Sequence, residues 1–233
     1  MRLGARLRAV ADKVPAAEVI ADIGTDHGYI PIYLMQKGRI QRAIATDIHE
    51  GPAGRAALHA ETAGLAEKID IRVGNGLSVL SAGEAAGAVM AGMGGFMIRD
   101  ILRDGNDVAA RMRWFVLQPN THVSDLRVWL SRNGYAVEEE ILCEENGKLY
   151  VILFVVHGKM DTPKGLMADI GRLPEFADVK LFQAYLDQLI SYRRQIAEGI
   201  CEHTQNENNR VKRKQALAEI AELEDWKWKL THK

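Results

Sequence analysis

The chain has 233 residues, of which 47% are hydrophobic and 26% charged, and its 30 basic side chains nearly balance its 31 acidic ones. This composition excludes a disordered chain, because the apolar content is high and the net charge is close to zero. No run of about 18 apolar residues occurs, so no membrane-spanning segment is expected. The charge balance also excludes a non-specific polyanion binder, so any nucleic-acid contact must come from a local group of basic residues.

The two cysteines and seven histidines show no spacing that is typical of a metal or redox site. Residues 1–8 carry charges where a secretion signal would be apolar. We therefore expect a cytoplasmic protein with reduced thiols, no metal ion and no membrane contact. The sequence does not indicate a protein partner.

A helix is predicted over residues 3–14, where apolar side chains recur on one face before Pro15 ends the pattern. Arg2, Arg6 and Lys13 fall together on an adjacent face of this helix. They form either a solvated basic side or a stripe that contacts phosphates, and the placement of the charges by itself favours the solvated side.

Five short apolar segments follow, and each is predicted to be a buried strand. They alternate mostly with stretches of helical spacing, and they cover residues 19–23, 43–46, 69–73, 86–91 and 114–117. Repeated strand–helix units predict a parallel sheet with helices on both faces. The fifth strand is expected to end at Leu117, with Pro119 in the turn before a helix over residues 123–133.

Two further strands, 135–143 and 149–157, flank the sequence Asn146-Gly147, which is a strong signal for a β-hairpin. Five parallel strands followed by an antiparallel hairpin resemble the class I methyltransferase fold, an α/β fold. Dehydrogenase domains normally finish with a parallel sixth strand.

The C-terminal part has a different pattern. Residues 161–176 are expected to be a linker, with one short helical piece, between a domain over 1–160 and a helical hairpin over 177–233. Apolar side chains from Phe182 to Ile196, including Tyr192, recur at coiled-coil spacing, and the polar segment 202–210 is predicted to be a turn. Just beyond lies the densest basic run of the chain, a solvated helix start or an RNA contact: Arg210, Lys212, Arg213 and Lys214.

The sharpest motif lies at residues 19–31, where the first strand ends in Asp22 and Gly24 and a tight loop with Gly28 opens the next helix. Ligands of open α/β sheets bind at the carboxyl ends of the strands. Asp47, at the end of the second strand, is placed to accept the ribose hydroxyls of an adenosine-type cofactor. An ordinary strand–turn–helix is the alternative.

This loop favours S-adenosylmethionine over NAD. It lacks the crowded glycines that bring backbone amides against a pyrophosphate. Asp26 would repel a pyrophosphate but suits a cationic sulfonium or amino group. No phosphate-binding Gly-Lys-Ser/Thr motif is present.

Three other strand ends carry candidate residues. Asn75 is placed either to bond an adenine edge or to make an ordinary turn. Gly92 belongs to a run with three glycines in four positions, which suits backbone lying against a ligand or a flat base. Gln118 and Asn120 supply neutral amides, which suit a base edge, although Asn120 is equally suited to capping the next helix.

Together, the sequences DIGTDHGYIP, AGMGG and LQPN resemble the TrmK family of bacterial tRNA methyltransferases, which act on N1 of adenine 22 in the D-loop. The resemblance implies S-adenosylmethionine as cofactor and tRNA as partner. The cofactor contacts it implies are Asp22, Gly24, Thr25, Asp26, His27, Gly28, Asp47, Ile48, Asn75, Gly76, Gly92, Met93 and Gly94. The catalytic candidates are Asp26, Tyr29, Gln118 and Asn120, and the RNA-binding candidates are the two basic groups described above.

Adenine N1 has an available lone pair, so an in-line methyl transfer needs no general base and depends on positioning. The product is cationic, and Asp26 is the best candidate to stabilise it. Two alternatives stay open: an enzyme of the same fold that acts on a small molecule, and a non-catalytic RNA-binding module.

Overall fold

The computed structural model describes residues 1–201 and 206–232, so part of the turn predicted at 202–210 lies outside the described residues. The chain divides into two compact units, Met1–Arg172 and Leu173–Lys233, called here the N-terminal and C-terminal units. Among the helices of the described residues, none is long and apolar enough to span a membrane.

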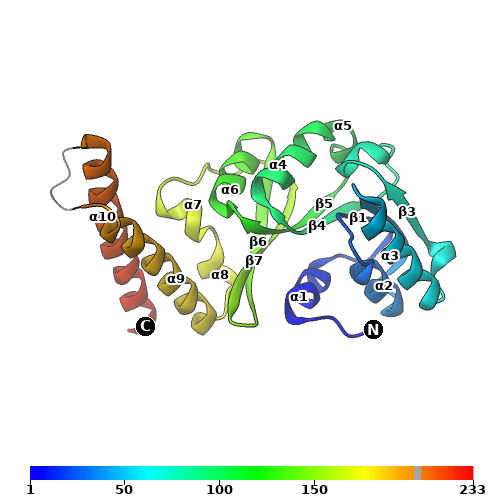
Figure 1. The fold of residues 1–233 in the computed structure, drawn as a ribbon, viewed down its shortest axis with the longest axis horizontal. Helices are drawn as coiled ribbons and strands as arrows, with labels where there is room; N and C mark the ends of the chain where they lie inside the picture. The colour runs from blue at the N-terminus through cyan, green and yellow to red at the C-terminus, as the bar shows by residue number, and fades with distance from the viewer. Residues whose placement is uncertain (202–205, 233) are drawn as a thin grey trace. The chain divides into compact units, whose positions relative to one another are not determined.

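The N-terminal unit is built on a seven-stranded sheet in the order β3-β2-β1-β4-β5-β7-β6 (Figure 1). The strands are β1 Ala17–Ile23, β2 Ile40–Asp47, β3 Ile69–Val73, β4 Gly87–Gly94, β5 Trp114–Thr121, β6 Tyr135–Glu145 and β7 Lys148–His157. The first five are mutually parallel, and β7 runs antiparallel to both β5 and β6. The predicted class I methyltransferase fold is confirmed.

Helices cover both faces of this sheet (Figure 1). One face carries α1 Ala5–Lys13, α2 Tyr29–Gln36 and α3 Glu50–Thr62, and the other carries α4 Gly95–Asp104, α5 Asn106–Ala109 and α6 Val123–Arg132. Val10, Ile20 and Ile32 are completely buried in the core beneath the first group. The central strands are apolar along most of their length because helices cover both of their faces.

Strands β4 and β5 extend further than the sequence predicted. Pro119 lies within β5 opposite Met93, and not in a turn. The pairing is irregular around Gly92, whose φ of +82° few other residues adopt. A proline is tolerated in a strand at such an irregularity, where a ladder hydrogen bond is already missing.

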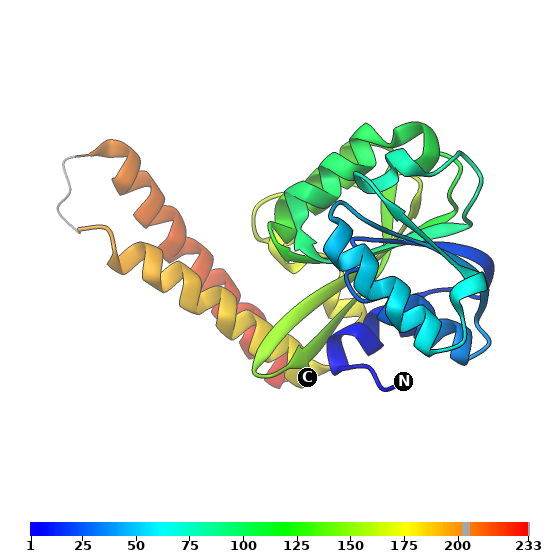
Figure 2. The same cartoon turned by 45° about the vertical axis from the view of Figure 1, so that its right-hand side comes forward.

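The β6–β7 hairpin turns at Asn146 and Gly147, which both have positive φ, as the predicted two-residue turn requires. Its tip lies beside α1 (Figure 2). Glu145 Oε1 accepts a hydrogen bond from the backbone N–H of Arg6 at 3.1 Å, within the first turn of α1. A carboxylate there satisfies an unpaired N–H and complements the helix dipole.

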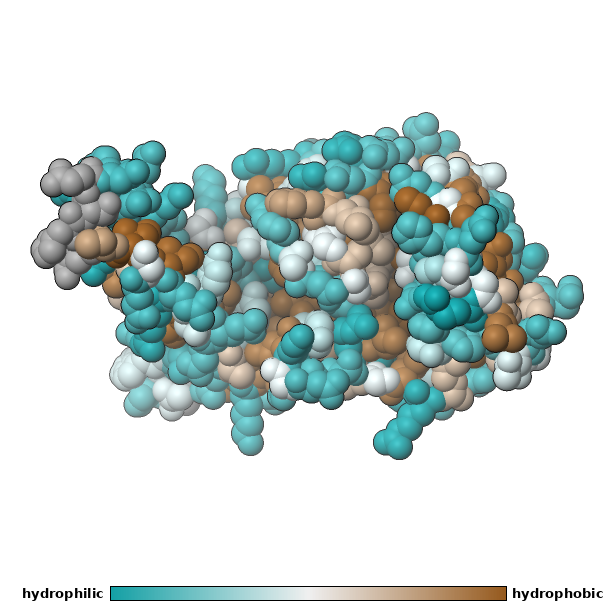
Figure 3. All heavy atoms as spheres, viewed as in Figure 1, coloured by the Kyte–Doolittle hydropathy of each residue, from teal (hydrophilic) through white to brown (hydrophobic). Residues whose placement is uncertain are grey.

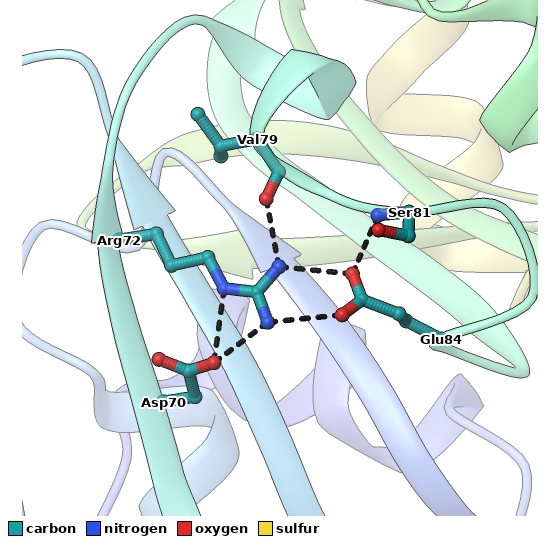
Figure 4. A network of polar contacts seen from close by, with 5 residues as sticks. All are labelled: Asp70, Arg72, Val79, Ser81 and Glu84. Carbon is teal, nitrogen blue, oxygen red and sulfur yellow. Dashed lines mark hydrogen bonds and ion pairs between the residues drawn. The ribbon is translucent and has the colours of Figure 1, made fainter.

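The edge strand β3 is covered by a network centred on Arg72 (Figure 4). The guanidinium donates to Asp70 Oδ2, to both carboxylate oxygens of Glu84 and to the carbonyl of Val79. The Arg72 hydrogen bonds hold the pKa of Glu84 below its usual range. The network ties the segment after β3, which includes the 3₁₀ helix η2 Gly76–Val79, to the edge of the sheet.

The segment predicted to be a linker contains the short helical piece that was expected there. Helix α7 Leu166–Ile170 belongs to the N-terminal unit, because the buried Arg127 donates to the carbonyls of Ala168 and Asp169 at 2.8 Å. Arg127 also forms a fully buried ion pair with Glu140 of β6 at 2.7 Å. Removing one partner of such a pair is strongly destabilising, since it leaves a buried charge.

The C-terminal unit contains α8 Leu173–Phe176 and two long antiparallel helices, α9 Val179–Glu198 and α10 Glu207–Thr231 (Figure 2). Ion pairs join Arg193 to Glu219 and Arg194 to Glu224. The predicted helical hairpin is confirmed, but the prediction of which α9 residues face α10 is partly wrong. Tyr192 is 58% exposed, whereas Arg193 is buried, because the 3.6-residue period carries the contact face from Ile190 to position 193.

Candidate active site

A cavity of about 320 Å³ lies at the carboxyl ends of β1 and β4. It is lined by Arg6, Leu7, Asp22, Gly24, Thr25, Asp26, His27, Tyr29, Ile30, Ala91 and Gly92. The structure therefore brings the first motif and the glycine-rich end of the fourth strand together, and adds one side of α1. Figure 3 shows a band of apolar residues, beige to brown, on the visible face of this unit between hydrophilic residues.

The loop after β1 has an unusual backbone. Gly24, Asp26 and Gly28 have φ values of +72°, +48° and +68°. A Cβ at Gly24 would lie 2.9 Å from Met93 Cε, the flexible end of that side chain, so the positive φ is what requires glycine at this position. Asp26 is strained in this region of φ, as residues of functional sites often are.

Asp22 is a buried carboxyl at the base of the cavity, with 4% of its surface exposed. The Thr25 hydroxyl donates to its Oδ2 at 2.6 Å. Burial raises the pKa of Asp22 to about 6, an effect that the Thr25 hydrogen bond opposes and the negative charge of Asp47 reinforces. A cationic ligand would favour the ionised form of this carboxyl.

Asp47 ends β2 and is 9% exposed. Its Oδ1 accepts the N–H of His49 at 3.0 Å, and its Oδ2 accepts that of Asp26 at 3.4 Å. These backbone bonds fix the carboxylate, and each oxygen keeps a lone pair for a further donor. Ribose hydroxyls are donors of this kind.

Asp26 has partners that the sequence did not reveal. Its Oδ1 accepts from Arg55 Nη2 of α3 at 2.6 Å, and its Oδ2 lies 3.4 Å from His27 Nε2. The Arg55 ion pair offsets part of the negative charge that we expected to face a cation. The catalytic assignment of Asp26 stays a prediction.

Three stacked rings stand beside this loop. His27, Tyr29 and His59 have centroids 4.9–5.4 Å apart. His59 Nδ1 lies 2.9 Å from the carbonyl oxygen of His27, as an N–H donor would. No motif pointed to His59, because it lies 32 residues away on α3.

Gln118 and Asn120 form a closed network with the backbone of Gly92. Gln118 is fully buried, and its Oε1 accepts from Gly92 N–H at 3.1 Å and Arg6 Nη1 at 2.6 Å. Its Nε2 donates to Asn120 Oδ1 at 2.9 Å, and Asn120 Nδ2 donates to the Gly92 carbonyl at 2.8 Å. Gln118 therefore shapes the cavity wall, whereas the exposed Asn120 keeps one N–H for a ligand.

Gly94 and Gly95, the other glycines of this run, lie close to the end of β5, which leaves little room for a side chain. A Cβ at Gly95 would lie 2.5 Å from the carbonyl oxygen of His122, and one at Gly94 would lie 3.2 Å from Thr121 Oγ1. The exposed Phe96 ring follows and stacks on His122 with centroids 4.0 Å apart. No pattern in the sequence singled out this ring pair.

Other predicted cofactor residues lie outside this cavity. Asn75 lines a second one of about 310 Å³, with Leu77, Ser78, Met97, Asp100, Ile101, Asp104 and Gly105. Gly76, with a φ of +58°, packs against Ile101, where a Cβ would lie 2.9 Å away. Ile48, beside Asp47, is 57% exposed.

The three basic residues expected on one face of the first helix have different surroundings, and their role in RNA binding stays a prediction. Arg2 precedes α1, whereas Arg6 and Lys13 lie on it. Arg2 is exposed, Lys13 pairs with Glu139 of β6, and Arg6 lines the cavity. In the C-terminal unit, Arg210 pairs with Glu207, Lys212 and Lys214 are exposed, and Arg213 is partly buried.

Within residues 1–201 and 206–232, no three His, Cys, Asp or Glu side chains gather as a metal site. Cys143 and Cys201 are not joined in a disulfide.

Known proteins resemble this chain in sequence and in fold. Residues 3–153 match the family described as methyltransferase domain. The tRNA (adenine(22)-N(1))-methyltransferase of Bacillus subtilis is 36% identical over 228 residues, which cover 96% of this chain and 95% of that protein. The fold and the cavity define a class I methyltransferase.

Solved structures show which family of methyltransferases the chain resembles. That of the B. subtilis m1A22 tRNA methyltransferase TrmK has a TM-score of 0.85 and 33% identity, covering 97% of this chain and 99% of that one. A Streptococcus pneumoniae relative in complex with S-adenosyl-L-methionine has a TM-score of 0.82 and 30% identity, covering 95% and 98%. The chain belongs to the TrmK family of tRNA (adenine(22)-N(1))-methyltransferases.

Proposed function

We propose that this protein transfers a methyl group from S-adenosylmethionine to N1 of adenine 22 in tRNA. One observation carries the proposal: a chain that matches a tRNA (adenine(22)-N(1))-methyltransferase over 96% of its length places Asp22, Gly24 and Gly92 around one cavity. A non-catalytic module would not need this arrangement.

The residues present fit S-adenosylmethionine. Asp47 has lone pairs for the ribose hydroxyls, and Gly24 offers bare backbone beside them. Asp22 is a buried carboxyl whose ionised form a cationic ligand would favour. The bound cofactor supplies an electrophilic methyl group on a sulfonium.

The chain's own residues would orient the substrate. The Gln118–Asn120–Gly92 network fixes the backbone at the end of β4, where Gly92 has no side chain to keep a base away. The remaining N–H of Asn120 and the exposed Phe96–His122 ring pair are our candidates to orient the adenine. No general base is needed, because N1 attacks through its own lone pair.

Adenine N1 lies on the Watson–Crick edge, so a paired or stacked base must first be exposed. We expect the protein to bind folded tRNA in the cytoplasm. Exposed basic residues, among them Arg2, Lys212 and Lys214, are our candidates for phosphate contacts.

The test is to incubate the protein with methyl-labelled S-adenosylmethionine and unmodified bacterial tRNA, and then to identify the modified nucleoside after digestion. The expected product is 1-methyladenosine, and a tRNA with guanine at position 22 should accept no label. Label in free adenosine or another small molecule would favour a small-molecule enzyme. Cofactor binding without transfer to any tRNA would favour a binding module.

A further inference from the structure

The cavity contains a cation that the proposed methyl transfer does not use. Arg6 is partly buried, and its guanidinium donates one hydrogen bond, to Gln118 Oε1 at 2.6 Å. It forms no ion pair with any carboxylate in the described part of the chain. Arg8, on another side of the same helix, pairs with Asp12 at 2.9 Å.

Three elements hold Arg6 in place. Glu145 of β6 accepts its backbone N–H, Gln118 of β5 accepts its Nη1, and its Cζ lies 5.5 Å from the centroid of the Tyr150 ring of β7. The guanidinium itself contacts a neutral amide and an aromatic ring, and no carboxylate among the described residues pairs with it. Four of the five guanidinium N–H groups are thus available to an anion.

The cavity has the charges that a zwitterion requires. Asp22 and Asp26 provide negative charge, and Arg6 is the one Arg or Lys among the lining residues. Its Nη1 lies 3.4 Å from the position that a Cβ on Gly92 would occupy, so glycine leaves room beside the guanidinium.

This inference rests on the proposed function, in which the cofactor has a single anionic group, the α-carboxylate of its methionine moiety. We propose that Arg6 binds this carboxylate. A guanidinium matches a carboxylate with paired N–H donors, and such charge-assisted bonds are about twice as strong as neutral ones. A tRNA phosphate is the less favoured partner, because the side chain lines a cavity and is hydrogen-bonded to the buried Gln118.

The experiment compares two ligands that differ only in this group: S-adenosylmethionine and decarboxylated S-adenosylmethionine, which retains the sulfonium and the amine. Binding is measured by titration calorimetry. Wild-type protein should prefer the carboxylated ligand by roughly tenfold to a hundredfold. In Arg6→Gln this preference should fall below about threefold, with little change in affinity for the decarboxylated ligand.

Two variants keep the test interpretable. Arg8→Gln removes an exposed guanidinium of the same helix and should keep the wild-type preference. Arg6→Lys keeps the charge without the paired donors and should show an intermediate preference, which a purely structural role would not produce. Thermal unfolding verifies that each variant is folded.

Equal weakening of both ligands by Arg6→Gln would overturn the proposal and assign Arg6 to support of the cavity wall. Unchanged preference with a raised KM for tRNA would also overturn it and assign Arg6 to the RNA. If wild-type protein binds neither ligand, the proposed function fails first, and this inference fails with it.

Discussion

Gln118 accepts a hydrogen bond from Arg6 at 2.6 Å, although the two residues are 112 positions apart. The same oxygen accepts the N–H of Gly92. One buried amide therefore links helix α1, the glycine-rich end of β4 and strand β5 at the wall of the cavity.

The first prediction concerns this amide. Gln118→Leu leaves the Gly92 N–H and the Arg6 donor without their acceptor, so the free energy of unfolding should fall by about 1–3 kcal/mol. Urea denaturation measures the change. The control Gln188→Ala, which removes an exposed amide of α9, should stay within about 0.5 kcal/mol of wild type. A Gln118→Leu protein as stable as wild type would show that the network contributes little.

The second prediction concerns the ribose. Asp47→Ala removes a fixed carboxylate with open lone pairs, and S-adenosylmethionine binding should weaken by about 2–4 kcal/mol. Calorimetry measures the affinity, with the exposed Asp12→Ala as a control that should bind normally. An unchanged affinity would remove Asp47 from the cofactor site.

The third prediction concerns charge at the reacting centre. Asp26→Asn keeps the shape of the side chain, and turnover should fall by about tenfold, the lower end of electrostatic effects, because Arg55 already offsets part of the charge. The affinity for S-adenosylmethionine should fall less. Single-turnover kinetics separate the two effects, and equal losses in both would make Asp26 a simple cofactor ligand.

The fourth prediction concerns pH. Because burial raises the pKa of Asp22 to about 6, the folded protein holds this proton more tightly than the unfolded chain does. Its contribution to stability therefore declines as the pH rises from about 4 to 6. A cationic ligand requires the ionised form, so affinity should increase with pH over the same range, by up to tenfold per unit below pH 6.

Calorimetric titrations with S-adenosylmethionine between pH 5 and pH 7 test this. The isosteric Asp22→Asn should bind weakly and without this pH dependence. Wild-type affinity that does not vary over the range would show that Asp22 does not face the cationic part of the cofactor.

The fifth prediction concerns the RNA. Replacing the basic run of α10, Arg210, Lys212, Arg213 and Lys214, with alanine should raise the KM for tRNA and leave S-adenosylmethionine affinity intact. For every phosphate that is no longer neutralised, the salt slope of tRNA binding should decrease by about one. Undiminished tRNA affinity after deletion of residues 177–233 would limit the C-terminal unit to a stabilising role.

Much of the fold was predictable because local patterns specify it. An apolar run specifies a strand, and the Asn146-Gly147 turn specifies a hairpin. Each of these signals involves only a few neighbouring residues. The predictions failed where distant partners decide. Strand β5 continues past Leu117 because β4 pairs with it through Thr121, and Tyr192 is exposed because the facing helix contacts Ile190 and Arg193 instead.

The candidate site divides in the same way. The sequence was sufficient to predict Asp22, Gly24 and Asp47 as candidate site residues, because the carboxyl ends of strands in a parallel sheet meet at one edge. The residues that form ion pairs with Asp26 and Lys13 could not be predicted from the sequence. Arg55 of α3 forms an ion pair with Asp26, and Glu139 of β6 forms one with Lys13. Both contacts join segments that are far apart in the chain.

The sequence by itself determined the fold class, the family and the strand ends that carry the ligand-binding residues, since backbone conformation and hydrophobic periodicity are local properties. Only the tertiary structure decided that Gln118 is part of the wall and that Arg6 is a cation in the cavity. The sequence shows which side chains carry a charge. The effect of each charge depends on its burial and on the charges beside it, and folding determines both.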